Sequence, residues 1–409
     1  MTTSRRDILK GLLSGPLYAS AARALPLGMP GALPDKQSFP GTAGMTYLNA
    51  AFAHPLGVQG YNGAEAFLQA RIYEPTQSWP RTNPRNAAVA AFAGLINAAP
   101  TEIAVVPSTM GGENMLCAAL GLGPEAGVVT DAYHYDASLA MYGEMQLRGV
   151  PVAVVKPRDN RIPLEDIEPL LKKNIKLLAV SQIGSLTGHQ HDLKALCDLA
   201  HSKNVLVYAD IVQAAGAIPM DVKQSGVDFA CCGTYKWLMG EFGVGFLYVR
   251  PDRLEQLRHM QWGWRSFSSN GHHILPFDAP GPAIGDWKLG TSTASHLEVG
   301  TPDWCALATA TASIAYIRAL GVETIQRYRQ PMVDRLQAEL PKQGFLPLTP
   351  APATGPTTAF AYKGAAAKFG PALDAAKIKI TISENHIRVS PSVYNDMEDI
   401  ERLLTALKS

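Results

Sequence analysis

The chain has 409 residues, of which 47% are hydrophobic and 17% are charged, and its formal net charge is +1. This composition indicates a globular protein with a sizeable core, and the length predicts two or more domains. A chain so close to neutral gives no reason to expect nucleic acid or an anionic membrane as the main partner. Its five cysteines lack CxxC or ligand-like spacing, so they predict buried thiols rather than a disulfide framework or a metal site.

Residues 1–24 resemble a twin-arginine export signal. Arg5 and Arg6 precede the apolar segment GLLSGPLYAS, which is followed by a small-x-small cleavage pattern that ends at Ala24. The apolar part is shorter than the ~20 residues that a spanning helix needs, and glycine and proline interrupt it, so we expect no permanent membrane anchor. The pattern predicts a periplasmic protein. The alternative is a basic, unstructured start on a cytoplasmic protein.

Residues 25–44 are rich in proline and glycine and show no periodicity, which predicts a linker that follows the surface. The first structured segment is expected to begin near Met45. Two helices are then predicted over residues 57–74 and 84–98, with a polar, proline-containing connection between them.

The stretch EIAVVPSTMGGENMLCAAL, residues 102–120, combines an apolar strand, a turn of small residues and a helix. Free amides at a helix N-terminus bind a phosphate dianion through hydrogen bonds and the helix dipole. The backbones of Met110 and Gly111 are therefore candidate phosphate ligands, with the hydroxyl of Ser108 or Thr109 nearby. A glycine pair that only makes a tight turn is the alternative.

Strands and helices alternate in the next part of the chain. Strands are predicted over residues 126–131, 150–156 and 176–183, and helices over 137–148, 163–172 and 192–202. This alternation is typical of a doubly wound α/β domain with a mostly parallel sheet. Tyr133 follows the first of these strands, where its ring could stack on a planar pyridine ligand; Tyr135 or His134 could take that place instead.

An acid and a lysine stand at the ends of two further apolar runs. VLVYAD ends in Asp210, and VDFACCG is followed by a turn that contains Lys236. Ligands bind at the carboxyl ends of parallel strands, and a desolvated lysine there can condense with an aldehyde, as enzymes that use pyridoxal 5′-phosphate (PLP) require. Asp210 would lie under the protonated pyridine nitrogen, and Gln213 can reach the phenolic oxygen. A buried ion pair is the alternative.

The chain after Lys236 predicts one more sheet strand over residues 242–249, a tryptophan-rich loop, and a long helical region. We therefore expect a large PLP-binding domain over residues 45–300, bridging helices over 301–343, and a small C-terminal α+β domain over 344–409.

Five ordered blocks resemble the class V aminotransferase family of fold-type I PLP enzymes. They are TYLNAA, Asp210-x-x-Gln213 followed by GAIPMDV, GVDFACCGTYKWL, GTPDW from Gly300, and IRVSPSVYN near the C-terminus. The resemblance covers nearly the whole chain after the export segment. It implies a large, mostly parallel doubly wound sheet domain with a small C-terminal α+β domain.

The resemblance also implies roles for individual residues. Lys236 would form the Schiff base with PLP and then move the Cα proton, while Asp210 would keep the pyridine nitrogen protonated. The Tyr235 hydroxyl would reach the phosphate. Arg388 would bind a substrate α-carboxylate through a bidentate pair.

Other expected site residues lie early in the chain and in the segment after Lys236. Asn49 and His54 are candidates for the substrate side, although a lone histidine in a loop is more often structural. Thr301 and Trp264 would complete the cofactor site from a partner subunit, which implies a homodimer.

Departures from the family pattern reduce the number of candidate reactions. Residues 306–409 contain no cysteine, which argues against a persulfide-relaying desulfurase, and Gln213 stands where kynureninase-like sequences usually have histidine. The sequence therefore predicts an exported PLP enzyme that acts on a free or peptide-linked amino acid, most simply as an aminotransferase. A C-S or C-C lyase or an epimerase is the alternative, and a catalytically silent binding protein is a remote one.

Overall fold

The structure is a computed structural model that describes residues 32–74 and 83–408. The predicted export signal and the first part of the predicted linker lie outside these residues. The remainder of the linker follows the surface through a short turn, η1 (Pro40–Thr42), and inserts the buried Phe39 between Tyr316 and Tyr394.

A seven-stranded sheet forms the centre of the molecule, with the strand order β2-β8-β7-β6-β5-β3-β4. The neighbours β4, β3, β5, β6 and β7 are parallel, whereas β8 runs antiparallel to both β7 and β2. The strands are β2 (Ile103–Val106), β3 (Gly127–Asp131), β4 (Val152–Val155), β5 (Ile175–Ser181), β6 (Leu206–Asp210), β7 (Phe229–Gly233) and β8 (Gly245–Val249). The predicted doubly wound, mostly parallel sheet is thus confirmed.

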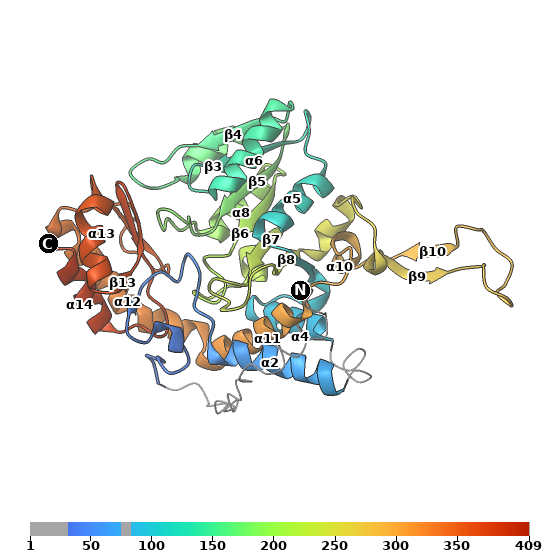
Figure 1. The fold of residues 1–409 in the computed structure, drawn as a ribbon. Coiled ribbons are helices and arrows are strands. Elements are labelled where there is room, and N and C mark those ends of the chain that lie inside the picture. Colours follow the sequence, from blue (N-terminus) through green and yellow to red (C-terminus); the bar gives the residue numbers. More distant parts are fainter. Residues whose placement is uncertain (1–31, 75–82, 409) are drawn as a thin grey trace, which may run out of the picture.

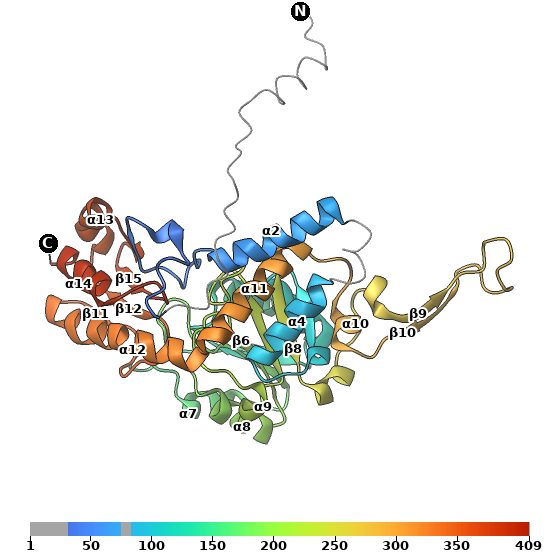
Figure 2. The ribbon, with the colours of Figure 1, turned by 90° about the horizontal axis from the view of Figure 1, so that it is seen from below.

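Helices cover both faces of this sheet (Figures 1 and 2). Alternate strand residues pack to opposite sides: Tyr208 lies with α5 and α6, and Val207 lies with α4, α8 and α11. α11 also packs against α2. The long helices are α2 (Val58–Tyr73), α4 (Pro84–Leu95), α5 (Thr109–Leu120), α6 (Asp136–Leu147), α8 (Leu193–Ser202) and α11 (Trp304–Leu320).

Short helical turns connect the larger elements. They are η2 (Pro100–Glu102), α7 (Leu164–Ile167), η3 (Glu168–Leu170), α9 (Val222–Ser225), η4 (Pro251–Gln256), η5 (Trp264–Ser266), α10 (Thr293–Leu297) and η6 (Pro341–Gln343). The single helix predicted over residues 163–172 is wrong, because the segment divides into α7 and η3 at Pro169, which cannot donate a helical hydrogen bond.

A smaller unit follows at the C-terminal end, coloured red in Figure 1. Its antiparallel sheet has the order β11-β12-β15-β14. Its elements are β11 (Leu346–Pro347), β12 (Thr358–Ala361), α13 (Ala365–Ala375), β13 (Ile378–Lys379), β14 (Thr381–Ser383), β15 (His386–Val389) and α14 (Met397–Ala406). The first strand, β1 (Thr46–Tyr47), pairs in parallel with β13, so the start of the described chain is joined to this unit.

The predicted bridging region contains α11 and α12 (Val322–Glu339), which meet at Gly321. Gly321 has a φ of 81°, a conformation that favours glycine. Within the described residues no single helix is long and apolar enough to cross a membrane, although α11 and Val322–Gln343, bent by 74°, together meet that length and composition.

A hairpin replaces the expected tryptophan-rich loop. β9 (Phe267–Gly271) and β10 (Asp286–Leu289) form an antiparallel pair that projects from the body in both ribbon views (Figures 1 and 2). Large apolar side chains are exposed near its tip, including Ile274, Phe277 and Ile284. A two-stranded hairpin is at best marginally stable alone in water, and this one exposes an apolar tip.

Candidate active site

The candidate site lies where β6 and β7 end at the carboxyl edge of the parallel sheet. Asp210 is the last residue of β6 and is buried, and one of its carboxylate oxygens accepts a 2.9 Å hydrogen bond from the Val212 N–H. In the described part of the chain no hydrogen bond reaches its other oxygen. Burial raises the pKa of Asp210, while the Val212 N–H, His134 and Lys236 act in the opposite direction.

Lys236 follows β7 and is only 8% exposed. Burial lowers the pKa of Lys236 to about 8 against the attraction of Asp210, and the positive charge of Arg388 adds to the lowering. Its ammonium lies 5.7 Å from the centroid of the Tyr235 ring. Among the described residues it has neither a hydrogen bond nor a salt bridge, so this amine is poised to react with a ligand.

The predicted phosphate site is the N-terminus of α5. Its capping residue Ser108 accepts a 2.9 Å hydrogen bond from the Gly111 N–H, and the Thr109 hydroxyl accepts a 2.9 Å bond from the Gly233 N–H of β7. Gly111 N–H is therefore already satisfied, and the amides of Thr109 and Met110, which have no acceptor in the described ranges, remain for an anion. A Cβ at Gly112 would lie 2.5 Å from Cys231 Sγ, so glycine is required for α5 to approach β7.

The three aromatic candidates after β3 occupy different environments. Tyr133 is half-buried, its N–H donates to Asp131, and its ring centroid lies 5.5 Å from that of His189. Tyr135 is exposed, whereas His134 is buried and bonded at both ring nitrogens. Burial raises the pKa of Tyr235, and Tyr135 lies close enough to add to this rise, so both Tyr133 and Tyr135 remain candidates for stacking on a ligand, and His134 is the least available of the three.

Gln213 is hydrogen-bonded at both ends of its side-chain amide. Its Nε2 donates to the Ala51 carbonyl at 3.0 Å, and its Oε1 accepts from Trp237 Nε1 at 2.8 Å. Both ends of the amide thus tie the segment at Ala51 to the segment that carries Lys236. In this arrangement Gln213 supports the site, and the second N–H of its Nε2, which has no partner among the described residues, is the donor left for the predicted contact with a phenolic oxygen.

Arg388, on β15, brings the small domain to the candidate site. Its guanidinium donates to the Ser185 carbonyl at 2.6 Å and to the Thr381 hydroxyl at 3.0 Å, and Thr381 donates in turn to Asn49. Only two of its five N–H donors are therefore used, and Nε is buried with no partner among the described residues. Burial lowers the pKa of Arg388 to about 10, so it still carries its charge at neutral pH.

Both ring nitrogens of His54 are bonded within the described chain, which favours the structural alternative for this residue. Its Nδ1 bonds to the Pro55 carbonyl and its Nε2 to the Ser392 hydroxyl, each at 2.8 Å. The ring also packs edge-on against Phe39 and Tyr394. Burial lowers the pKa of His54 to about 4, so the ring is neutral and its role here is structural.

Trp264 and Thr301 are exposed, and neither contacts Lys236 within the described chain. Trp264 is 75% exposed at the base of the β9–β10 hairpin. Thr301 and Gly111 border one pocket of about 400 Å³ beside α5. The structure thus places these two predicted cofactor residues on the surface rather than in their own chain's site.

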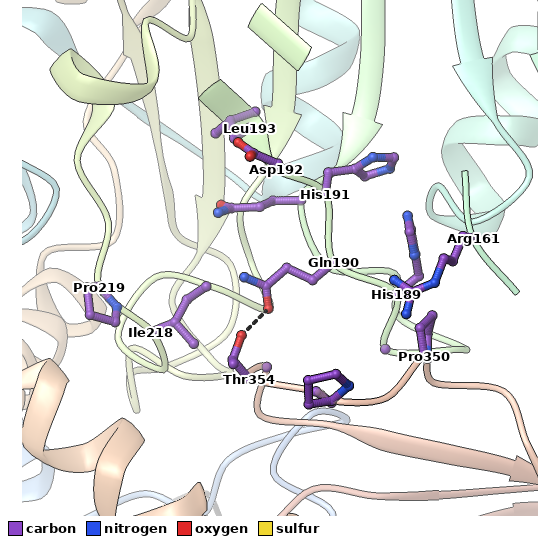
Figure 3. A pocket seen from close by; sticks show the side chains of 15 residues that line it. Arg161, His189, Gln190, His191, Asp192, Leu193, Ile218, Pro219, Pro350 and Thr354 are labelled. Carbon is purple, nitrogen blue, oxygen red and sulfur yellow. Dashed lines mark hydrogen bonds between the residues drawn. The ribbon is translucent and has the colours of Figure 1, made fainter. Parts of the chain in front are cut away.

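A polar pocket of about 460 Å³ lies between the two domains. In Figure 3, Gln190 faces Thr354 across the pocket at hydrogen-bond distance, Arg161 and His189 lie on one side, and Ile218 and Pro219 lie on the other. None of the predicted site residues lines it, but the pocket adjoins the candidate site, because its lining residue Gln182 donates a backbone hydrogen bond to the Asp210 carbonyl at 2.9 Å. No group of three or more possible metal-ligating His, Cys, Asp or Glu residues occurs in the described ranges.

One buried acid was not predicted. Glu113 of α5 accepts hydrogen bonds from Ser138 and Tyr142 and pairs with His134. The available signal was an acid inside the otherwise apolar helix GGENMLCAAL, where a charge must find partners.

The comparisons with known proteins agree with this geometry. A family described as Aminotransferase class-V matches residues 78–403. The uncharacterized aminotransferase YcbU of Bacillus subtilis is 25% identical over 379 residues, which are 90% of this chain and 95% of YcbU. Isopenicillin N epimerase of Streptomyces clavuligerus is 27% identical over 251 residues, 57% of this chain and 59% of the relative.

Solved structures show the same fold. The cystine C-S lyase C-DES, in complex with cysteine persulfide, has a TM-score of 0.80 at 19% identity and covers 91% of this chain and 99% of its own. The cysteine desulfurase of Thermococcus onnurineus NA1 has a TM-score of 0.77 at 20% identity, covering 91% and 96%. The chain therefore belongs to the class V aminotransferase family. It is a PLP-dependent enzyme with the predicted fold-type I architecture.

The residues present fit PLP on grounds visible in the structure itself. Among the described residues, the buried Lys236 ammonium has no hydrogen bond and lies close to a buried acid, and the first amides of α5 have no bonded acceptor. Arg388 Nε is a buried donor without an acceptor in the described chain, a costly state that an anionic ligand would relieve. The groups that would hold the cofactor are therefore Lys236, Asp210, the start of α5 and one of the tyrosines that follow β3.

Proposed function

We propose that this protein is an exported aminotransferase that transfers the amino group of a free or peptide-linked amino acid. The observation that carries the proposal is the position of Arg388: its unused donors lie in the same buried region as Lys236, whose pKa responds to its charge. A guanidinium fork binds a carboxylate in two parallel hydrogen bonds, which would fix an α-amino acid with its amino group toward the lysine.

The chain's own residues have divided roles in this reaction. Bound PLP supplies the electron sink for the pair left at Cα. Lys236, with its lowered pKa, can act as the nucleophile that holds the cofactor and as the base that takes the Cα proton. Asp210 would keep the ring nitrogen charged, and Arg388 would hold the substrate carboxylate while that proton moves.

A half-reaction tests the assignment. The PLP-loaded protein is mixed with single amino acids, and we expect the cofactor to change to its amine form while a 2-oxo acid appears in equal amount. An absorbance spectrum follows the cofactor, and chromatography follows the acid. Release of sulfide, pyruvate or alanine while the cofactor keeps its aldehyde form would overturn the aminotransferase assignment.

A lyase or an epimerase is the second candidate, and the similarity to isopenicillin N epimerase and to C-DES supports it. All these reactions begin at the same Cα, and their outcome depends on which bond stands perpendicular to the ring. An epimerase would exchange the Cα hydrogen with solvent deuterium and lose optical purity without forming a 2-oxo acid, so the same incubation separates the candidates.

Export to the periplasm is the second part of the proposal, and the twin-arginine pattern at Arg5 and Arg6 supports it. Replacement of both arginines, Arg5→Lys and Arg6→Lys, is expected to reduce the periplasmic pool and leave the protein in the cytoplasm. Cell fractionation measures the two pools. An undiminished periplasmic pool of the double variant would contradict the signal assignment.

A homodimer is the third part, and the exposure of Trp264 and Thr301 supports it, because residues needed for the cofactor would then be supplied to a partner's site. We expect Thr301→Ala and Lys236→Ala each to impair activity. After the two variants are mixed and allowed to exchange subunits, part of the activity should return, since one site of the mixed dimer is intact. A monomer by light scattering would exclude the shared site.

A further inference from the structure

A buried polar network lies on the face of the sheet that α5 and α6 cover. Its centre is Glu113, whose side chain is 0% exposed. Tyr142 and Ser138 of α6 each donate to Glu113 at 2.6 Å, and His134 Nε2 lies 3.0 Å from the same carboxylate. A carboxylate with three hydrogen-bond partners can remain ionised in the interior.

The network continues from His134 to the floor of the active site. His134 Nδ1 lies 2.9 Å from the hydroxyl of Ser181, the last residue of β5. Ser181 and Asp210 are paired in register on adjacent parallel strands, so their side chains leave the sheet on the same face. His134 therefore stands between a buried acid on α5 and the acid of the predicted cofactor site.

The charges of the network support each other. Burial alone would raise the pKa of Glu113, but the charge of His134 and the three hydrogen bonds hold it below its usual value. Burial likewise opposes charge on His134, yet Glu113 raises the pKa of His134 above its usual value, and Asp210 and Asp131 add to this. The two groups thus form an imidazolium-carboxylate pair.

Asp210 needs such a neighbour. Its burial favours the neutral acid, and a neutral acid cannot stabilise a protonated ring nitrogen. Two cationic groups oppose this burial effect, His134 and Lys236, and His134 has the larger influence. Lys236 is no longer a free ammonium once it bonds to the cofactor's aldehyde carbon, whereas His134 takes no part in that bond.

Resting on the proposed function, we propose that Glu113 is a positioning residue that holds His134 as an imidazolium beside Asp210 and so keeps Asp210 ionised under the cofactor's ring nitrogen. Glu113 touches neither the cofactor nor the substrate and acts through His134. Its own negative charge repels Asp210 directly, but this effect is smaller than the attraction of His134. Removal of the Glu113 charge should therefore favour the neutral form of Asp210.

The test uses the PLP-loaded protein with the cofactor isotope-labelled at its ring nitrogen, and nitrogen NMR reports whether that atom carries a proton. We expect a protonated ring nitrogen in the unaltered protein near neutral pH. In Glu113→Gln, the pH at which Asp210 takes up a proton should rise by about 1–3 units, as loss of a close opposite charge predicts, and the ring nitrogen should lose its proton near neutral pH.

Tyr142→Phe is the matched control, because it removes one hydrogen bond to Glu113 and leaves the charge in place. Its ring nitrogen should stay protonated, and circular dichroism with thermal unfolding checks that each variant is folded. If Glu113→Gln does not fold, His134→Gln takes its place with the same expected loss. A protonated ring nitrogen in the folded charge variant would overturn this inference alone, whereas failure of the unaltered protein to bind PLP through Lys236 would overturn the proposed function as well.

Discussion

Replacement of Lys236 by alanine is expected to abolish covalent capture of PLP and to lower kcat by about 10²–10⁴-fold, the usual contribution of a catalytic acid or base. The reason is that this lysine is the buried amine at the carboxyl edge of the sheet. Borohydride reduction followed by peptide mass spectrometry should label the peptide that contains Lys236 in the unaltered protein and not in the variant.

Lys194→Ala is the control for this experiment. Lys194 lies on the surface of α8, where it pairs with Asp198, so its loss should change neither labelling nor activity. Label on a lysine other than Lys236 in the unaltered protein would show that the site has been misplaced.

The lowered pKa of Lys236 predicts how the rate of PLP capture depends on pH. The neutral amine is the nucleophile, and burial lowers the pKa of Lys236 to about 8, so the capture rate should rise as the pH increases through about 8 and then level off. Arg388→Ala removes a positive charge that contributes to this lowering, so its midpoint should move to higher pH. A midpoint near the ordinary lysine value of about 10.4 in the unaltered protein would contradict the assignment.

Arg388→Ala is expected to have the second large effect, an increase in KM of about 100-fold for substrates with a free α-carboxylate, since the loss of one partner of a buried charged pair costs about 2–5 kcal/mol. Steady-state kinetics measure it, and kcat should change less than KM. Arg388→Lys keeps the charge without the fork, so its KM should fall between the two.

A substrate amide that lacks the α-carboxylate separates binding from folding in this series. The unaltered protein and Arg388→Ala should use the amide equally poorly, because neither has a carboxylate to hold. An unchanged KM for carboxylate substrates in Arg388→Ala would show that the natural substrate is bound by other groups, as a peptide-linked amino acid could be.

Much of the large domain could be predicted because its strands are short apolar runs that end in a turn. β5, β6 and β7 follow this pattern, and each begins and ends close to its expected position. The β9–β10 hairpin could not be predicted in this way, since its strands carry mostly exposed side chains and lack a buried face that would give an alternating pattern. The sequence therefore predicts a loop at this place.

The residues of the candidate site also differ in how well the sequence predicts them. Asp210 and Lys236 could be predicted because each lies at or just after the end of an apolar run, and ligands bind at the ends of parallel strands. The environments of Gln213 and His54 could not, because their hydrogen-bond partners, such as Ala51 and Ser392, are distant in sequence. The roles of Gln213 and His54 depend on tertiary contacts that no local pattern records, and the same is true of Glu113.

The pairing of β1 with β13 determines when the small domain can complete its fold during synthesis. Thr46 lies opposite Ile378, and Asn49 bridges to Ser390, so the small domain gains its neighbouring strand from the other end of the chain. Contacts of such large sequence separation form late, because a long loop must close before they stabilise anything. The large sheet can assemble during synthesis, but Arg388 and Asn49 can meet only after nearly the whole chain has left the ribosome. Activity should therefore appear at the end of folding, in a single late step.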